Sequence, residues 1–172
     1  MRKIFAFAIV TALTFGVSGV IAQSYKFGHI DSQEILKVMP DMDSAQAKIT
    51  NYAESLQAQI EELQVEFNKK YQDYLQKRST FTDAIREMKE KELTDMQQRA
   101  QEYQQVAEQD YQRYQAETMK PVIDKADAAI KKVAKANGFT YIFDTSSGVL
   151  LYFSEQSIDI APLVKKELGI IE

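Results

Sequence analysis

Few residues in this 172-residue chain could carry out chemistry. The chain has one histidine, His29, and no cysteine. A zinc site needs three or four nitrogen, sulfur or carboxylate ligands, so a single imidazole argues against zinc. His29 and Asp31 could act as a base and its orienting carboxylate, but residues two apart on a strand share a face for structural reasons alone. Neither G-x-x-x-x-G-K nor G-x-G-x-x-G occurs. We therefore expect no catalytic residues, no metal site and no cofactor.

Basic and aromatic side chains gather in one short stretch, which suits binding better than catalysis. From Lys69 to Lys91 there are seven basic and four acidic residues, whereas residues 41–68 hold six acids and one lysine. Such a stretch could approach an anionic membrane surface or an acidic partner, although a solvated helix face with i,i+4 pairs has the same pattern. Aromatic residues at helical spacing are usually core, but exposed ones could contact a partner. The residues that we predict to bind a client protein are Lys69, Lys70, Tyr74, Leu75, Lys77, Arg78, Phe81, Ile85 and Met88.

The first 22 residues have the pattern of a secretory signal peptide. Two basic residues precede an apolar run over residues 4–17, and the segment ends in small residues at Ala22. The run is shorter than the roughly 20 residues that span a bilayer. We predict export, with removal of the leader near Ala22. Loss of two of the 21 basic residues leaves 19 against 25 acidic ones, a net charge of −6, which argues against a nucleic-acid partner.

The middle of the chain predicts a long antiparallel helical hairpin. No glycine or proline lies between Pro40 and Pro121, and these are the residues that normally interrupt helices. Two stripes with steps of three and four residues each mark one helix face. They consist of Ile49, Tyr52, Leu56, Ile60, Leu63, Phe67, Tyr71 and Tyr74, and of Met96, Ala100, Tyr103, Ala107, Tyr111, Tyr114, Thr118 and Val122. We predict an arm over residues 42–120 with its tip near 78–84, where hydroxyl residues can cap a new helix. Pro121 predicts a kink or a helix restart.

The segments that flank the arm predict short strands. Residues 25–30 have the pattern of a first strand. Residues 139–143 and 149–153 are rich in β-branched and aromatic side chains, and residues 144–148 between them favour a turn, which predicts a β-hairpin. A short final helix should begin near Asp159 or Pro162 and end before Gly169.

The expected fold class is α+β, with a long antiparallel helical hairpin that projects from a small β-rich body. We assign residues 23–41 and 121–172 to that body. Three short strands bury too little core to be stable alone, so we expect strands of several chains to combine in a homo-oligomer. The residues that we predict for this oligomerisation body are Phe27, Ile30, Tyr141, Phe143, Leu151 and Phe153.

The order of these elements resembles the Skp/OmpH family of periplasmic chaperones over nearly the whole mature chain. The resemblance rests on KFGHID at residues 26–31, KPVI at 120–123 and AIKKVAKANGFTYIFD at 129–144. It implies a periplasmic homotrimer with a small β-barrel body and three arms around a cavity that holds unfolded outer-membrane proteins without ATP. It carries over no catalytic residues. The best-known members are strongly basic, whereas this chain is acidic except at the predicted tip.

The resemblance makes an ATP-independent holdase the leading functional hypothesis. Its expected partners are unfolded outer-membrane protein precursors, further copies of this chain and, at the basic tips, an anionic membrane surface. The alternative is a structural spacer or adaptor of the cell envelope whose arm tips bind one folded partner. An enzyme would need a cleft with convergent polar groups in the body.

Overall fold

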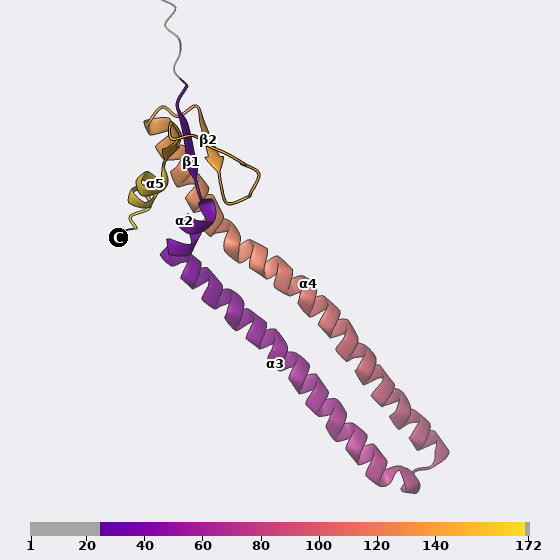
Figure 1. Cartoon of the computed structure of the whole chain (residues 1–172). Helices are drawn as coiled ribbons and strands as arrows, with labels where there is room; N and C mark the ends of the chain where they lie inside the picture. Colours follow the sequence, from indigo (N-terminus) through magenta and orange to yellow (C-terminus); the bar gives the residue numbers. More distant parts are fainter. Residues whose placement is uncertain (1–24, 171–172) are drawn as a thin grey trace, which may run out of the picture.

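The computed structural model describes residues 25–170, and the predicted signal peptide lies outside these described residues. A long two-helix arm projects from a small body in which both ends of the described chain lie (Figure 1). None of the helices in residues 25–170 combines the length and apolar character that crossing a membrane requires. The predicted α+β class is confirmed, with long helices and a small three-stranded sheet.

The arm consists of α3 (Pro40–Lys77) and the longer α4 (Asp83–Ala136), joined by a short 3-10 helix, η1 (Arg78–Thr80). At 1.5 Å per residue, the 38 residues of α3 give an arm about 57 Å long. The Oγ1 atom of Thr82 accepts a hydrogen bond from the Ile85 amide and caps the start of α4. This cap, with Asp83 in the first turn, lets the second helix begin at once after the reversal.

The prediction of a helix restart at Pro121 is wrong, because α4 continues through this residue into the body. Proline lacks only one amide hydrogen, and the neighbouring residues of α4 keep the helix intact through their packing. Val122 and Ala126 are both about 5% exposed and belong to the body core. The ribbon of α4 nevertheless changes direction near the level where the arm meets the body (Figure 1), as expected for an interior proline.

The two predicted stripes line the contact between α3 and α4. Ile49, Tyr74, Met96 and Ala107 are buried, and most of the other stripe residues are half-buried. Tyr52 contacts α4 through both its ring and its hydroxyl. The ring stacks on that of Tyr114 with the centroids 4.1 Å apart, and the hydroxyl donates a hydrogen bond of 2.9 Å to the Asp110 carboxylate. The arm is therefore a true two-helix unit, with its apolar side chains covered on one face only.

The sheet has three parallel strands in the order β2-β1-β3: β1 (Phe27–Ile30) lies between β2 (Tyr141–Asp144) and β3 (Ile158–Asp159). The predicted hairpin is wrong, because residues 149–153 form no strand. The strands β2 and β3 lie on opposite sides of β1 and run parallel to it. The segment between them must therefore cross from one side of the sheet to the other, and it cannot turn straight back along β2.

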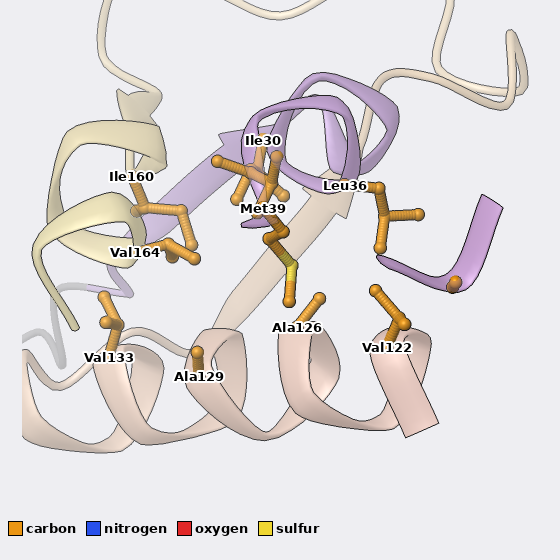
Figure 2. Packing of buried hydrophobic residues seen from close by; sticks show 11 residues of the cluster. Ile30, Leu36, Met39, Val122, Ala126, Ala129, Val133, Ile160 and Val164 are labelled. Carbon is orange, nitrogen blue, oxygen red and sulfur yellow. The ribbon is translucent and has the colours of Figure 1, made fainter. Parts of the chain in front are cut away.

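The body core lies between the sheet and three helices (Figure 2). The strand β1 leads into α2 (Ser32–Val38), and α5 (Ala161–Glu167) closes the chain as predicted. The core residues are Ile30, Ile35, Leu36, Met39, Ala45, Val122, Ala126, Ala129, Val133, Ile160 and Val164. A Cβ at Gly28 would lie 3.0 Å from the Phe139 ring, so a larger residue there would require this ring to move. The helices thus cover one face of the sheet.

Candidate binding surfaces at the arm tip and on the sheet

The arm tip is built around Tyr74, which is 7% exposed. Its ring packs against Phe81 with the centroids 6.3 Å apart, and its hydroxyl donates to the Glu90 carboxylate. This hydrogen bond raises the pKa of Tyr74 above its ordinary value. Tyr74 therefore joins α3 to α4 at the tip, and Phe81 is half-buried over it.

The basic residues of the tip differ in how firmly they are held. Lys70 pairs with Glu92 across the arm, and Lys77 lies 2.5 Å from Asp73 on the same helix. The hydrogen bond from Lys70, followed by that from Lys89, lowers the pKa of Glu92 to about 2, although burial acts in the opposite direction. Lys70 is thus partly occupied in holding the arm together.

Two predicted basic residues remain available for a partner. Lys69 and Arg78 make no ion pair within residues 25–170, and both are exposed. At the same end of the arm, Leu75, Ile85 and Met88 are 45%, 40% and 58% exposed. We define the tip surface as these five residues, which combine uncommitted positive charge with exposed apolar area.

A second apolar surface lies on the face of the sheet that the helices leave open. Side chains alternate along strands, so Phe27 of β1 and both Tyr141 and Phe143 of β2 point to this face. Phe27 stacks on Tyr141 at 6.2 Å and lies 6.4 Å from Phe143. These three rings are 42%, 61% and 42% exposed. Ile30, the remaining β1 residue predicted for the oligomerisation body, lies on the other face and is 2% exposed.

The segment that crosses the sheet enlarges this open face. Leu151 is 95% exposed, and Phe153 is 46% exposed although its ring stacks on His29 at 4.0 Å. We define the open sheet face as Phe27, Tyr141, Phe143 and Phe153, and Leu151 is an exposed residue of the adjoining crossing segment. Isolated exposed apolar residues are common, but a contiguous group of exposed aromatic rings is typical of interaction sites.

The geometry around His29 argues against the base and carboxylate pair considered from the sequence. The Nδ1 atom of His29 lies 2.9 Å from the Ser157 hydroxyl, and Asp31 instead accepts the Glu34 amide as the N-cap of α2. No group of three or more potential metal ligands in residues 25–170 is placed to hold an ion. His29 positions the crossing segment on the sheet.

Sequence reasoning missed the polar contacts that join the two helices of the arm. Lys70 with Glu92, Tyr74 with Glu90, and Tyr52 with Asp110 all bridge α3 and α4. The helices run antiparallel, so the two residue numbers of each pair have nearly the same sum, between 162 and 164. Once the reversal point is fixed, that sum identifies the partners, but the side-chain types alone do not.

Comparison with known proteins gives a consistent family assignment. The OmpH family, described as outer membrane protein (OmpH-like), matches residues 26–168. A crystal structure from Caulobacter crescentus, described as that of a candidate OmpH-like outer membrane chaperone, superposes with a TM-score of 0.73. It is 12% identical and the match covers 84% of each chain, so it shows a shared fold. No curated protein matches the chain.

The family match extends over the arm and over all the elements of the body. The OmpH-like family is non-enzymatic and periplasmic, and membership supports a chaperone role. A helical arm that projects from a three-stranded body is the architecture that the match predicts. The chain belongs to the OmpH-like family.

Proposed function

We propose that this protein is an ATP-independent periplasmic holdase that binds unfolded outer-membrane protein precursors and keeps them from aggregating. It reaches the periplasm through a signal peptide removed near Ala22. The observation that carries this proposal is the arm, which projects from the body (Figure 1). Apolar side chains are exposed along the length of this arm. Its role is to hold other chains by contact, without a nucleotide or a reaction.

The arm favours many weak contacts over one tight site. Exposed apolar residues occur at the tip and also at Val65 and Val106 farther along, which are 67% and 59% exposed. Each such contact contributes a fraction of a kcal/mol, and several arms linked in one assembly combine them through high effective concentration. Methionine and exposed leucine side chains adapt to different partners, which suits clients without a fixed structure. Release follows when the client folds into lipid and buries its own apolar surface.

Assembly into a homotrimer through the body is part of the proposal. The open sheet face holds exposed aromatic rings, and the outer edges of β2 and β3 carry no further strand within residues 25–170. Open edges and an uncovered apolar face are both unfavourable in a lone chain. A closed ring of copies covers the face and pairs the edges together. The arms then surround a common cavity.

The tip surface adds a charge-dependent contact, either with acidic segments of a client or with an anionic membrane surface. Lys69 and Arg78 supply the positive charge. Attraction between exposed charges is screened over about 8 to 10 Å at physiological salt, so this part of binding should weaken as salt is added. The double substitution Lys69→Gln with Arg78→Gln tests this charge-dependent contact. It is a better test than a change at Lys70, which would also loosen the arm.

The experiment that tests the holdase proposal follows light scattering as an unfolded outer-membrane barrel protein is diluted from urea. The purified mature chain should suppress aggregation at one trimer per client without nucleotide. Changing Leu75, Ile85 and Met88 to serine should weaken suppression of aggregation, and the changes Val65→Ser and Val106→Ser should weaken it to a smaller degree because they remove fewer contacts. A wild-type chain that leaves aggregation unchanged contradicts the proposal. Binding to one folded protein and to no unfolded chain would favour the adaptor alternative instead.

A further inference from the structure

The side of α3 that points away from α4 has no partner in the single chain. Beyond the body, α3 lies beside α4 alone (Figure 1). Val65 stands two residues from the stripe residues Leu63 and Phe67, and each residue turns a helix by about 100°, so Val65 points away from α4. It is 67% exposed. Glu61 and Lys69, four residues before and after it, are also exposed and share its side of the helix. We define the α3 outer face as Glu61, Val65 and Lys69.

The two charges of the α3 outer face are not used within the chain. Neither Glu61 nor Lys69 has an ion pair within the described residues 25–170. The Glu61 carboxylate accepts one hydrogen bond of 3.0 Å, from the neutral amide of Gln57. Lys70, the neighbour of Lys69, pairs instead with Glu92 across the arm. The α3 outer face therefore offers an acid and a base, with an apolar side chain between them, to a partner outside the chain.

This face is complementary to itself when two copies of α3 run antiparallel. If Val65 of one copy lies opposite Val65 of the other, residues equally far before and after Val65 share a level. Glu61 of each copy then lies at the level of Lys69 of the other. The contact has an apolar centre with an opposite-charge pair on either side. A parallel arrangement would instead place Lys69 beside Lys69 and Glu61 beside Glu61.

The antiparallel alignment also keeps the other acids of this side apart. The residues that then share a level are Ala58 with Gln72, Glu54 with Gln76, and Glu62 with Asn68. Each acid lies opposite an uncharged amide, which avoids the repulsion that like charges cause across an interface. All six of these residues are exposed. The complementarity therefore extends over about four helical turns, and not only over the three residues of the α3 outer face.

We propose that the α3 outer face binds the same face of a second copy in antiparallel orientation. The contact is two-fold symmetric, so it closes after two arms and adds no further copies. In the trimer proposed above all arms point the same way, so the contact joins arms of two different assemblies and leaves the contacts through the body unchanged. A single contact with two exposed ion pairs is weak, and several arms acting together strengthen it through high effective concentration. Client binding is not required.

Crosslinking tests both the contact and its direction. Because the chain has no cysteine, Ala58→Cys in one preparation and Gln72→Cys in another place single thiols at exposed sites of α3. Antiparallel pairing brings the two sites to one level, so a short bifunctional maleimide should link the mixed preparations at low salt. Either preparation alone should give at least about fivefold less product, since its thiols stay about 21 Å apart in the antiparallel contact. High salt should reduce the product in the mixture, because it screens the ion pairs.

Exchange of the two charges tests the ion pairs. Lys69→Glu and Glu61→Lys each bring like charges together at both levels, so each should raise the dissociation constant for pairing of assemblies at least about tenfold in sedimentation equilibrium at low salt. A mixture of these two variants has opposite charges at both levels and should pair as tightly as the wild type. The matched mixture of Lys69→Glu with Glu54→Lys has the same total charge but opposite charges at only one level, so it should pair more weakly.

The outcomes separate this contact from the holdase function. No crosslinked product in the mixture overturns the contact, and equal product from Ala58→Cys alone overturns its antiparallel direction. A mixture of Lys69→Glu with Glu61→Lys that pairs no better than either variant alone also overturns the proposal. Antiparallel pairing in a protein that fails to suppress aggregation upholds the contact and refutes only the holdase function.

Discussion

Leu151 offers a test of how the body assembles. This side chain is 95% exposed in the single chain, so replacing it removes no packing contact within that chain. In the proposed trimer the neighbouring copies cover the open sheet face and the crossing segment that carries Leu151. The substitution Leu151→Asp should therefore leave the fold of each copy intact and weaken the contact between copies.

The size of the effect follows from the area that assembly would cover. Burying a leucine side chain contributes about 2 kcal/mol, and each 1.4 kcal/mol changes an equilibrium constant about tenfold. Loss of this term alone raises the dissociation constant of each subunit contact about thirtyfold. The aspartate adds a further penalty because its charge would have to leave water without a partner.

Sedimentation equilibrium over a range of concentrations measures the change. The control is Val65→Asp, which makes a similar change at a 67% exposed site on α3, far from the body. Circular dichroism should show unchanged helix content in both variants. If Leu151→Asp assembles as tightly as Val65→Asp, the crossing segment is not part of the contact between copies, and the reasoning from the exposure of Leu151 is refuted.

Three further predictions concern stability. Ile160 is fully buried, so Ile160→Ala should lower the free energy of unfolding by about 3 kcal/mol, as read from urea titration at fixed protein concentration. Leu163 lies on the helix α5 that follows and is 39% exposed, so Leu163→Ala should lower the free energy of unfolding far less. Equal losses would contradict the assigned core. The pKa of Glu92 is lowered from 4.5 to about 2 by Lys70, so its carboxylate stabilises the arm above pH 4.5 and this contribution is lost as the pH falls toward 2. Thermal melts of Glu92→Gln and wild type should therefore differ at neutral pH and converge near pH 2, and a difference that persists there argues against the ion pair. Gly138 has a φ of +67°, so Gly138→Ala should lower stability by about 1 kcal/mol, and an unchanged urea midpoint would contradict that strain.

The arm could be predicted from the sequence because its signals are local. Two patterns predict helix directly. Residues 41–120 contain no glycine or proline, and the stripe residues have helical spacing. The cap at Thr82 was among the candidates for the same reason. The contacts across the arm, such as Lys70 with Glu92, depend on which residues of the two helices lie opposite each other. That alignment is known only once the structure of the turn between the helices is known.

The sheet shows where local patterns stop being sufficient. Residues 149–153 have strong strand propensity, and the turn-forming residues before them favour a hairpin, yet β1 takes the place beside β2. Strand pairing is decided between distant segments, so propensity identifies the segment but not its partner. The helix restart predicted as one alternative at Pro121 fails for a similar reason, since the packing of Val122 and Ala126 keeps α4 continuous across it.

The residues predicted to bind a client also differ in how well the sequence alone predicts their exposure. Exposure of Leu75, Ile85 and Met88 agrees with their predicted availability, whereas Tyr74 has the same aromatic character and is buried. Their exposure depends on which face of the helix each residue occupies, and the residue type does not determine that face. Their contact with a client stays a prediction.

Native mass measurement with a titrated, unfolded outer-membrane barrel protein tests the proposed holdase most directly, because it reports the number of copies and the bound client together. We predict three copies of the mature chain with one client, formed without nucleotide and with more than one kind of unfolded barrel. Single copies, or trimers that take up no unfolded chain, would contradict the proposal that arms joined at the body hold a client between them.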